Sequence, residues 1–341
     1  MLGGTDKIIL YSKGRQEAVP SLSQTEAKRP AEAGTTGSLA DAVAAKRKAD
    51  EAAQAILQNE GLKVGAQDPQ SPATPSCVQT RVGIGRRCLT PRDNFNDCPT
   101  CPQMVVVPAG EALVGSPFYE EGWASNEVPQ HKVTIKTPFA VGKFETTFAE
   151  WDVCLLESGC KHTPNDHKWG RGWRPVVDVS WEDAKQYVAW LSKKTELRYR
   201  LLSESEWEYV ARAGTLTAFS TGQSITSSDA NFDAGYTYGG SEKGRYLKST
   251  VEVGSFRPNA FGLYDMHGNV WEWVEDCWHT DYTGGPSDAS SWTDRCNERS
   301  RVLRGGSWID PPRIVRSAYR SRNIPTYRSA TVGFRVARAL D

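Results

Sequence analysis

The stretch from Phe261 to Trp278, which reads FGLYDMHGNVWEWVEDCW, decides the fold of this chain. Within it, Trp271 and Trp273 recur at the two-residue period of a β-strand, and Glu272 lies between them on the opposite face. Large rings on one face predict a strand that helps to build a core. A carboxylate on the other face, once buried, requires a counter-charge such as a metal cation or an arginine.

The charge of the chain argues against two broad classes of partner. Its 341 residues carry 41 basic and 41 acidic side chains, so no general field attracts nucleic acid. Nine arginines follow residue 300, but they alternate with Val, Ala, Ser and Pro, which favours internal salt bridges over nucleic-acid binding. No apolar run approaches the roughly 18 residues of a membrane-spanning helix, so no membrane span is predicted.

The chain divides by composition into four parts. Residues 1–37 are polar and predicted to be disordered. Residues 38–61 predict an Ala-rich helix that suits a stalk, with Ser38 as its N-cap and Gly61 as its end. Residues 62–103 predict a Cys- and Pro-rich linker. All 12 tryptophans lie after residue 122, so residues 104–341 are the predicted folded domain.

Helix-start signals recur within this domain. Ser180 is the expected N-cap of one amphipathic helix, and Ser203 with Glu206 predicts a capping box at the start of a second. Strands are predicted at residues 104–107 and 131–135, and a further helix near residue 146 or 147. Few regular elements and long Gly-rich loops indicate an α+β domain with a small antiparallel sheet.

The cysteine content favours an oxidising compartment. The eight cysteines are Cys77, Cys88, Cys98, Cys101, Cys154, Cys160, Cys277 and Cys296. An even number favours disulfides and a periplasmic or secreted protein. The first residues contain only a four-residue apolar patch, which is too short for a signal-peptide core, so the compartment is not assigned.

The first four cysteines allow two interpretations. Cys98 and Cys101 have the spacing of a zinc knuckle or a redox motif, and the two upstream cysteines could complete a metal site. The stretch is Pro-rich and lacks knuckle glycines, which favours disulfides. Their connectivity stays open at this point.

The last four cysteines predict two disulfides. Cys154 and Cys160 could close a short loop, and Cys277 and Cys296 bracket a segment rich in Gly, Ser, Asp and Thr. A bridge across that segment would remove on the order of 3 kcal/mol of unfolded-state entropy.

Several segments occur together in one order between residues 104 and 339. They are MVVVPAGEALVGS, NEVPQHKVTI, RLLSESEWEYVARAG, NAFGLYDMHGNVWEWVEDCW, RVLRGGSW and GFRVAR. This combination resembles the formylglycine-generating enzyme (sulfatase-modifying factor) family. The resemblance implies that family's variant of the C-type lectin fold, with two helices around a small twisted antiparallel sheet and long structured loops. It also implies a ligand site made by loops and the C-terminal strands.

The family's enzymes activate oxygen with copper(I) held by two cysteine thiolates, which are the soft ligands that this ion requires. The resemblance places that pair between the GGS motif and the Arg-rich run that follows. Here the region reads GGSWIDPPRIVRSAYRSRNIP and contains no cysteine, with Asp310 near the first thiolate position. No copper is therefore expected. The alternative is an authentic copper-dependent oxidase that modifies a sulfatase-type cysteine.

The resemblance also implies a structural calcium ion at the segment YDMHGNVWE. Asp265 and Glu272 would supply side-chain oxygens, and Gly268 and Val270 would supply backbone carbonyls. Such oxygen ligands suit a hard cation. The alternative interpretation is that Glu272 pairs with an arginine and Asp265 caps a turn.

The segment from Gly305 to Arg335 fits the frame GGSWxxxPxxxRSAxRxRxxPxxRxxxxGFR. The frame resembles that of family members diversified by reverse-transcriptase retroelements, which use this fold as a receptor. Undiversified members share the frame, so diversification is one of two interpretations. Exposed Tyr, Ile and Arg at such positions are types that anchor interfaces. The predicted ligand-binding residues are Trp308, Ile309, Asp310, Arg313, Ile314, Tyr319, Ser321, Thr326, Tyr327 and Ser329.

These observations favour a non-catalytic member of the resembled family. The domain would act as a ligand- or protein-binding module through residues 305–335, with calcium as a structural cofactor. Its partner would be a protein or a small ligand of unknown identity.

Overall fold

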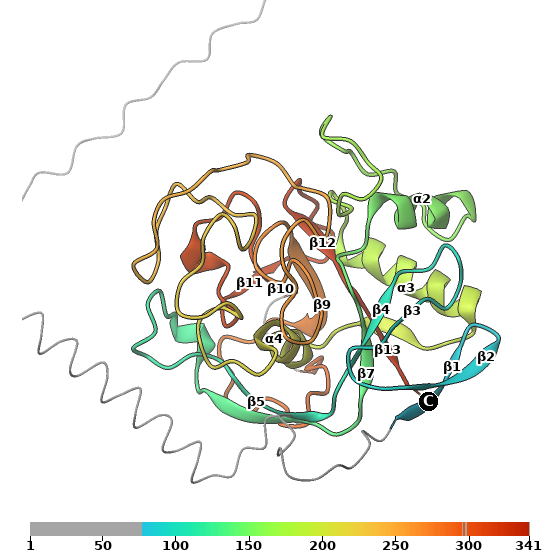
Figure 1. The fold of residues 1–341 in the computed structure, drawn as a ribbon, viewed down its shortest axis with the longest axis horizontal. Coiled ribbons are helices and arrows are strands. Elements are labelled where there is room, and N and C mark those ends of the chain that lie inside the picture. The colour runs from blue at the N-terminus through green and yellow to red at the C-terminus, as the bar shows by residue number, and fades with distance from the viewer. Residues whose placement is uncertain (1–76, 295, 297–298, 341) are drawn as a thin grey trace, which may run out of the picture. The chain divides into compact units, whose positions relative to one another are not determined.

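The computed structural model describes residues 77–294, 296 and 299–340 (Figure 1). The predicted disordered segment 1–37, the predicted helix 38–61 and the first part of the predicted linker lie outside the described residues. No helix in the described part of the chain is long and apolar enough to cross a membrane.

Helices and strands alternate with long loops. The α-helices of the described residues are α2 (Phe148–Leu156), α3 (Trp181–Thr195) and α4 (Glu204–Arg212), and the short 3-10 helices are η1 (Ser125–Glu127) and η2 (Pro312–Ile314). The first strands are β1 (Val78–Val82), β2 (Gly85–Leu89), β3 (Asn94–Phe95), β4 (Met104–Val107), β5 (Gly110–Val114), β6 (His131–Ile135) and β7 (Phe139–Gly142). The later strands are β8 (Tyr199–Leu201), β9 (Trp271–Cys277), β10 (Arg301–Arg304), β11 (Arg320–Asn323), β12 (Val332–Phe334) and β13 (Val336–Ala339).

The strands form two main sheets and two hairpins. One sheet has the order β3-β4-β7-β13-β8, the other has the order β11-β10-β9-β12, and β1-β2 and β5-β6 pair separately. All pairs are antiparallel except β12, which runs parallel to β9. The C-terminal strands therefore contribute to both main sheets: β10, β11 and β12 to one, and β13 to the other. This confirms the mixed α+β class with few helices and several small antiparallel sheets.

The helices begin where their capping signals predicted. Thr147, Ser180 and Ser203 each accept a hydrogen bond from the backbone N–H of the third helical residue, which returns a carboxylate to the cap. Each box satisfies two N–H groups that would otherwise lack partners at a helix start. Helices α2 and α3 lie side by side (Figure 1).

Strand β9 divides the core into two clusters, as its alternation predicted. Trp271 and Trp273 pack with residues of α2 and α3 in one cluster. Val274, on the other face, packs with Trp207 of α4 in the second. The strand is buried on both faces, so Glu272 is buried too.

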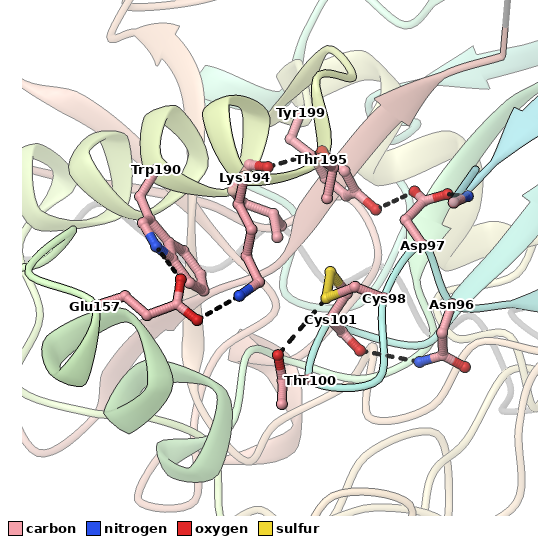
Figure 2. The surroundings of a disulfide bond; sticks show 12 residues. Asn96, Asp97, Cys98, Thr100, Cys101, Glu157, Trp190, Lys194, Thr195 and Tyr199 are labelled. Carbon is pink, nitrogen blue, oxygen red and sulfur yellow. Dashed lines mark hydrogen bonds and ion pairs between the residues drawn. A yellow bond between two sulfur atoms is a disulfide. The ribbon is translucent and has the colours of Figure 1, made fainter.

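Residues 77–103 are folded, which corrects the predicted linker that extended to residue 103. They form β1, β2 and β3, and Leu89 and Phe95 enter the core. Both carboxylate oxygens of Asp97 accept from Arg338 at 2.8 Å. The Tyr199 hydroxyl donates to Asp97 at 2.5 Å (Figure 2). Contacts with residues far away in the chain hold this segment in place. Its local composition does not reveal such contacts, and for this reason it was predicted to be a linker.

All eight cysteines form disulfides. The predicted pairs Cys154–Cys160 and Cys277–Cys296 are present, and the open connectivity resolves into Cys77–Cys88 and Cys98–Cys101. Within the described residues, no group of three His, Cys, Asp or Glu side chains is placed to hold a metal ion. Cys98 and Cys101 therefore form a disulfide, as the Pro-rich composition of this stretch favoured, and do not form a zinc knuckle.

Removing the Cys277–Cys296 bridge is expected to lower the free energy of unfolding by about 3 kcal/mol, because it closes the longest loop of the four. Removing Cys98–Cys101, whose two cysteines are separated by three positions in the sequence, is expected to lower the free energy of unfolding by about half as much. Urea unfolding of the two double-alanine variants measures both values. A larger loss for the Cys98–Cys101 variant would contradict the loop-closure argument.

Candidate ligand-binding surface

The frame of the C-terminal segment is built from buried arginines. Each of them meets a buried carboxylate from another part of the chain, which confirms the prediction of internal salt bridges. The pairs are Arg304–Glu208 at 2.5 Å, Arg316–Glu127 at 2.6 Å, Arg320–Glu204 at 2.6 Å, Arg335–Glu272 at 2.7 Å and Arg338–Asp97 at 2.8 Å. Burial alone would raise the pKa of Glu204, but Arg320 and Arg304 outweigh it and hold that pKa below its ordinary value.

These pairs fix the backbone on which the candidate residues stand. Arg316 also donates to Glu120 at 2.6 Å and to the Gly122 carbonyl at 2.6 Å, so it ties the loop before η1 to η2. Arg304 donates to the backbone carbonyls of residues 317, 318 and 319 at 2.8–3.0 Å. Breaking such buried, paired charges is costly, and the segment is therefore held in one conformation.

The predicted ligand-binding residues all reach the surface, and none of them is buried. Ile309, Arg313, Thr326 and Tyr327 are exposed, and the others are half-buried. They lie in the loop after β10, in η2, at the start of β11 and in the loop before β12. Frame positions among and after them, such as Ala318 and Phe334, are fully buried.

Trp308 is the centre of an aromatic cluster on this surface. Its ring stacks on Tyr246 with 6.3 Å between centroids, and its other neighbour is Trp169, edge-on at 5.3 Å. Its indole N–H donates to the Ala330 carbonyl at 3.2 Å. A second pair of rings, Trp271 and Tyr319, lies 6.0 Å apart.

Asp310 lies beside these rings. Its Oδ2 accepts from the backbone N–H of Ser307 at 3.0 Å and from the Ser307 hydroxyl at 2.6 Å. Burial raises the pKa of Asp310, against the hydrogen bonds from Ser307 and Trp271 and the charge of Arg313. The backbone N–H of Asp233 donates to the Asp310 carbonyl at 2.9 Å, which brings a second carboxylate-bearing residue to the cluster.

Three members of this cluster were not predicted from the sequence: Trp169, Asp233 and Tyr246. They come from two loops far from Trp308 in the chain, and no local pattern marks them. His267 was not predicted either, and its buried ring links the residue after η2 to the loop at residue 220. Its Nδ1 lies 2.8 Å from the Val315 carbonyl and its Nε2 lies 3.0 Å from the backbone nitrogen of Ser220.

Comparison with known proteins identifies the family to which the folded part of the chain belongs. Residues 90–340 match the model of the sulfatase-modifying factor enzyme 1-like domain. The chain belongs to this family. The match spans the two main sheets and every residue of the candidate surface.

Relatives of the family agree with this assignment. The chain is 30% identical to a formylglycine-generating enzyme of Streptomyces coelicolor over 70% of its own length and 89% of that protein's. Among solved structures, PvdO from Pseudomonas aeruginosa is 41% identical, covers 74% of this chain and all of its own, and gives a TM-score of 0.66. Treponema denticola variable protein 1 is 25% identical over 70% of this chain and 95% of its own, with a TM-score of 0.52.

The chain spans about half the length of the first curated relatives that it matches. It covers 47% of a serine/threonine-protein kinase, pkn1, of Chlamydia pneumoniae, at 28% identity over 86% of this chain. The activity of such a whole protein is not assigned to this domain.

The residues at the family's copper position offer no thiolate. Asp310 hydrogen-bonds to Ser307, and all eight cysteines of this chain are paired in disulfides elsewhere. A carboxylate is a hard oxygen ligand and does not suit copper(I). The donor set therefore does not fit the copper of the family's enzymes.

The residues predicted to bind calcium fit this ion only in part. Both oxygens of Glu272 accept hydrogen bonds, from Arg335 at 2.7–3.2 Å and from the Trp207 indole at 2.8 Å. Asp265 accepts from the backbone N–H of Gly254 at 2.7 Å through one oxygen, and its other oxygen is buried without a partner. Arg335 thus supplies the counter-charge that Glu272 requires, and calcium at Asp265, Gly268, Val270 and Glu272 stays a prediction.

Proposed function

We propose that this family member acts as a ligand- or protein-binding module through the surface at residues 305–335. One observation carries the proposal: exposed and half-buried candidate side chains stand on a backbone fixed by buried arginine–carboxylate pairs. A backbone that is already rigid loses little conformational entropy when it binds a partner. Residues such as Trp308, Ile309 and Tyr327 supply the apolar and aromatic area that anchors an interface.

The likeness to Treponema denticola variable protein 1 supports the resemblance of residues 305–335 to the segment of diversified family members. Diversification of the segment stays a prediction. A near-repeat of the coding bases for residues 305–335 beside a reverse-transcriptase gene would support it, and a neighbouring sulfatase gene would favour the copper-oxidase alternative.

The domain is expected not to convert a cysteine-containing sulfatase peptide to formylglycine, even with added copper(I), because no thiolate pair lies between Gly305 and Arg322. Mass spectrometry of the peptide measures the loss of the thiol and the formation of the aldehyde. A family enzyme that carries the cysteine pair serves as the positive control. Copper-dependent aldehyde formation by this chain would overturn the non-catalytic assignment.

A matched pair of isoleucines tests the binding surface. Ile309 is half exposed on the candidate surface, and Ile84 is fully exposed in the β1-β2 turn. Peptides selected from a displayed library on the wild-type chain are expected to bind Ile309→Asp at least tenfold more weakly, because the charge interrupts the apolar contact. Ile84→Asp should bind them as the wild type does.

Titration by fluorescence polarisation measures both affinities. Selected peptides that bind Ile309→Asp and Trp308→Ala as tightly as the wild type would show that the surface is not the binding site. A selection that yields no binders at all would also count against the proposal.

A further inference from the structure

The chemistry of the Trp308 cluster points to a class of ligand. Trp308, Tyr246 and Trp169 form a continuous row of rings, with interplanar angles of 20° and 83° at the two contacts. All three side chains are half-buried, so each keeps part of its ring at the surface. Aromatic faces carry negative electrostatic potential and attract organic cations.

Two carboxylates add to this negative potential. Asp233 and Asp310 are joined through their backbones, and both act on Tyr246, where burial and the two negative charges raise the pKa of the hydroxyl. Neither carboxylate forms a salt bridge within the described residues. The cluster therefore holds two acidic groups whose charge is not neutralised by a direct ion pair.

Two cations of the protein lie at the edge of the cluster. Lys248 is exposed, and its Nζ lies 5.9 Å from the centroid of the Tyr246 ring. Arg313 is exposed as well and acts on Asp310 through charge alone. The Lys248 ammonium group therefore lies within cation–π range of the Tyr246 ring.

We propose that the row Trp169–Trp308–Tyr246, with Asp310 and Asp233, binds an organic cation, such as an ammonium or guanidinium group presented by the ligand. The proposal rests on the proposed function and names the ligand chemistry of its surface. Lys248 occupies one ring face in the free protein and is displaced when the ligand binds. An anionic ligand held by Arg313 and Lys248 is the opposing outcome.

Three small probes of the same shape separate these outcomes. They are choline, its neutral isostere 3,3-dimethyl-1-butanol, and the anion 3,3-dimethylbutanoate. Two-dimensional ¹H–¹⁵N spectra of the full chain follow the indole signals of Trp308 and Trp169, which Trp→Phe variants assign. Choline is expected to shift both signals saturably, with a Kd at least tenfold below that of the alcohol.

Three variants test the cation proposal: two are expected to weaken choline binding and the third to strengthen it. Trp308→Ala is expected to abolish the choline response, and Asp310→Asn to raise the Kd for choline at least threefold without changing that for the alcohol. Lys248→Met is expected to lower the Kd for choline, since it removes the competing cation. Lys248 is exposed, so this variant keeps the fold even if Asp310→Asn does not.

Equal binding of choline and the alcohol would overturn the cation proposal and leave the proposed function intact. Tighter binding of the carboxylate probe would overturn it in favour of Arg313 and Lys248. The absence of any shift at probe concentrations of tens of millimolar would overturn it too, while the peptide titrations with Ile309→Asp would still decide the proposed function separately.

Discussion

Replacing Arg335 with methionine is expected to lower the free energy of unfolding by about 3–5 kcal/mol, because it leaves a buried carboxylate without its counter-charge. Arg335 and Glu272 are fully buried, and the guanidinium also donates to the carbonyls of Gly142 and Tyr264 at 2.8–2.9 Å. In the variant, Glu272 keeps only the Trp207 indole as a donor. Urea unfolding at neutral pH measures the loss.

A pair whose arginine is partly exposed provides the control for this variant. Its carboxylate, Asp183, is buried but also accepts hydrogen bonds from the backbone N–H and the hydroxyl of Ser180. Arg328 pairs with Asp183 at 2.7 Å, but its side chain is 40% exposed. Arg328→Met is therefore expected to cost less than about 1 kcal/mol. The double variant Arg335→Met with Glu272→Met should recover most of the stability, because a well-packed apolar pair can replace a buried ion pair.

Two further buried carboxylates lie close enough to Glu272 to interact with it electrostatically. Burial raises the pKa of Glu145 well above its ordinary value, and the charges of Asp265 and Glu272 raise it further. Three buried carboxylates thus share one guanidinium. A loss below about 1 kcal/mol in Arg335→Met would contradict the assignment of Arg335 as the required counter-charge of this group.

Calcium at Asp265, Gly268, Val270 and Glu272 is tested by the melting temperature of the wild type in calcium and in chelator. Equal temperatures would contradict the calcium prediction and leave Arg335 as the counter-charge of Glu272. A rise that corresponds to about 2.7 kcal/mol at a hundredfold excess of calcium over its Kd, and that Glu272→Gln abolishes, would establish the calcium prediction instead.

The stability of the domain is expected to fall by about 3 kcal/mol through His267 alone as the pH drops from 7 to 4. Burial lowers the pKa of His267 to about 4, from an ordinary value of 6.5. A base whose folded pKa is depressed contributes its full stability above pH 6.5. That contribution is lost between pH 6.5 and 4, because the unfolded chain takes up the proton first.

The hydrogen bonds of the ring explain why it resists protonation. The backbone N–H of Ser220 donates to Nε2, so the single ring proton lies on Nδ1 and is donated to the Val315 carbonyl. A second proton on Nε2 would face that N–H group. Acid is therefore expected to weaken the packing of the loop that carries Phe219 against His267 and Val315, which lie under the candidate surface.

A variant without a titrating ring isolates this effect from other groups. Burial raises the pKa of Asp276 to about 7. The contribution of this residue to folding stability is therefore lost as the pH rises, which is the opposite direction to that of His267. The difference in unfolding free energy between the wild type and His267→Gln removes such shared contributions. It is expected to shrink by about 3 kcal/mol between pH 7 and 4, and a difference that does not change with pH would contradict the argument.

Local signals in the sequence determined the elements that depend on neighbouring residues. Ser180 and Ser203 fix helix starts because their side chains satisfy N–H groups only three residues away. The alternation around Trp271 and Trp273 fixes strand β9 because side chains in a strand point to opposite faces in turn. The order of motifs along the chain was sufficient to predict the family's fold.

Tertiary structure alone decided the contacts between distant residues. The sequence required a counter-charge for Glu272 but did not name Arg335, which lies 63 residues away. It gave residues 77–103 the composition of a loop, although Asp97 is held by Arg338 across 241 residues. Trp308 acquires Trp169 and Tyr246 as neighbours because long loops bring them together, and no periodic pattern encodes a contact between separate loops.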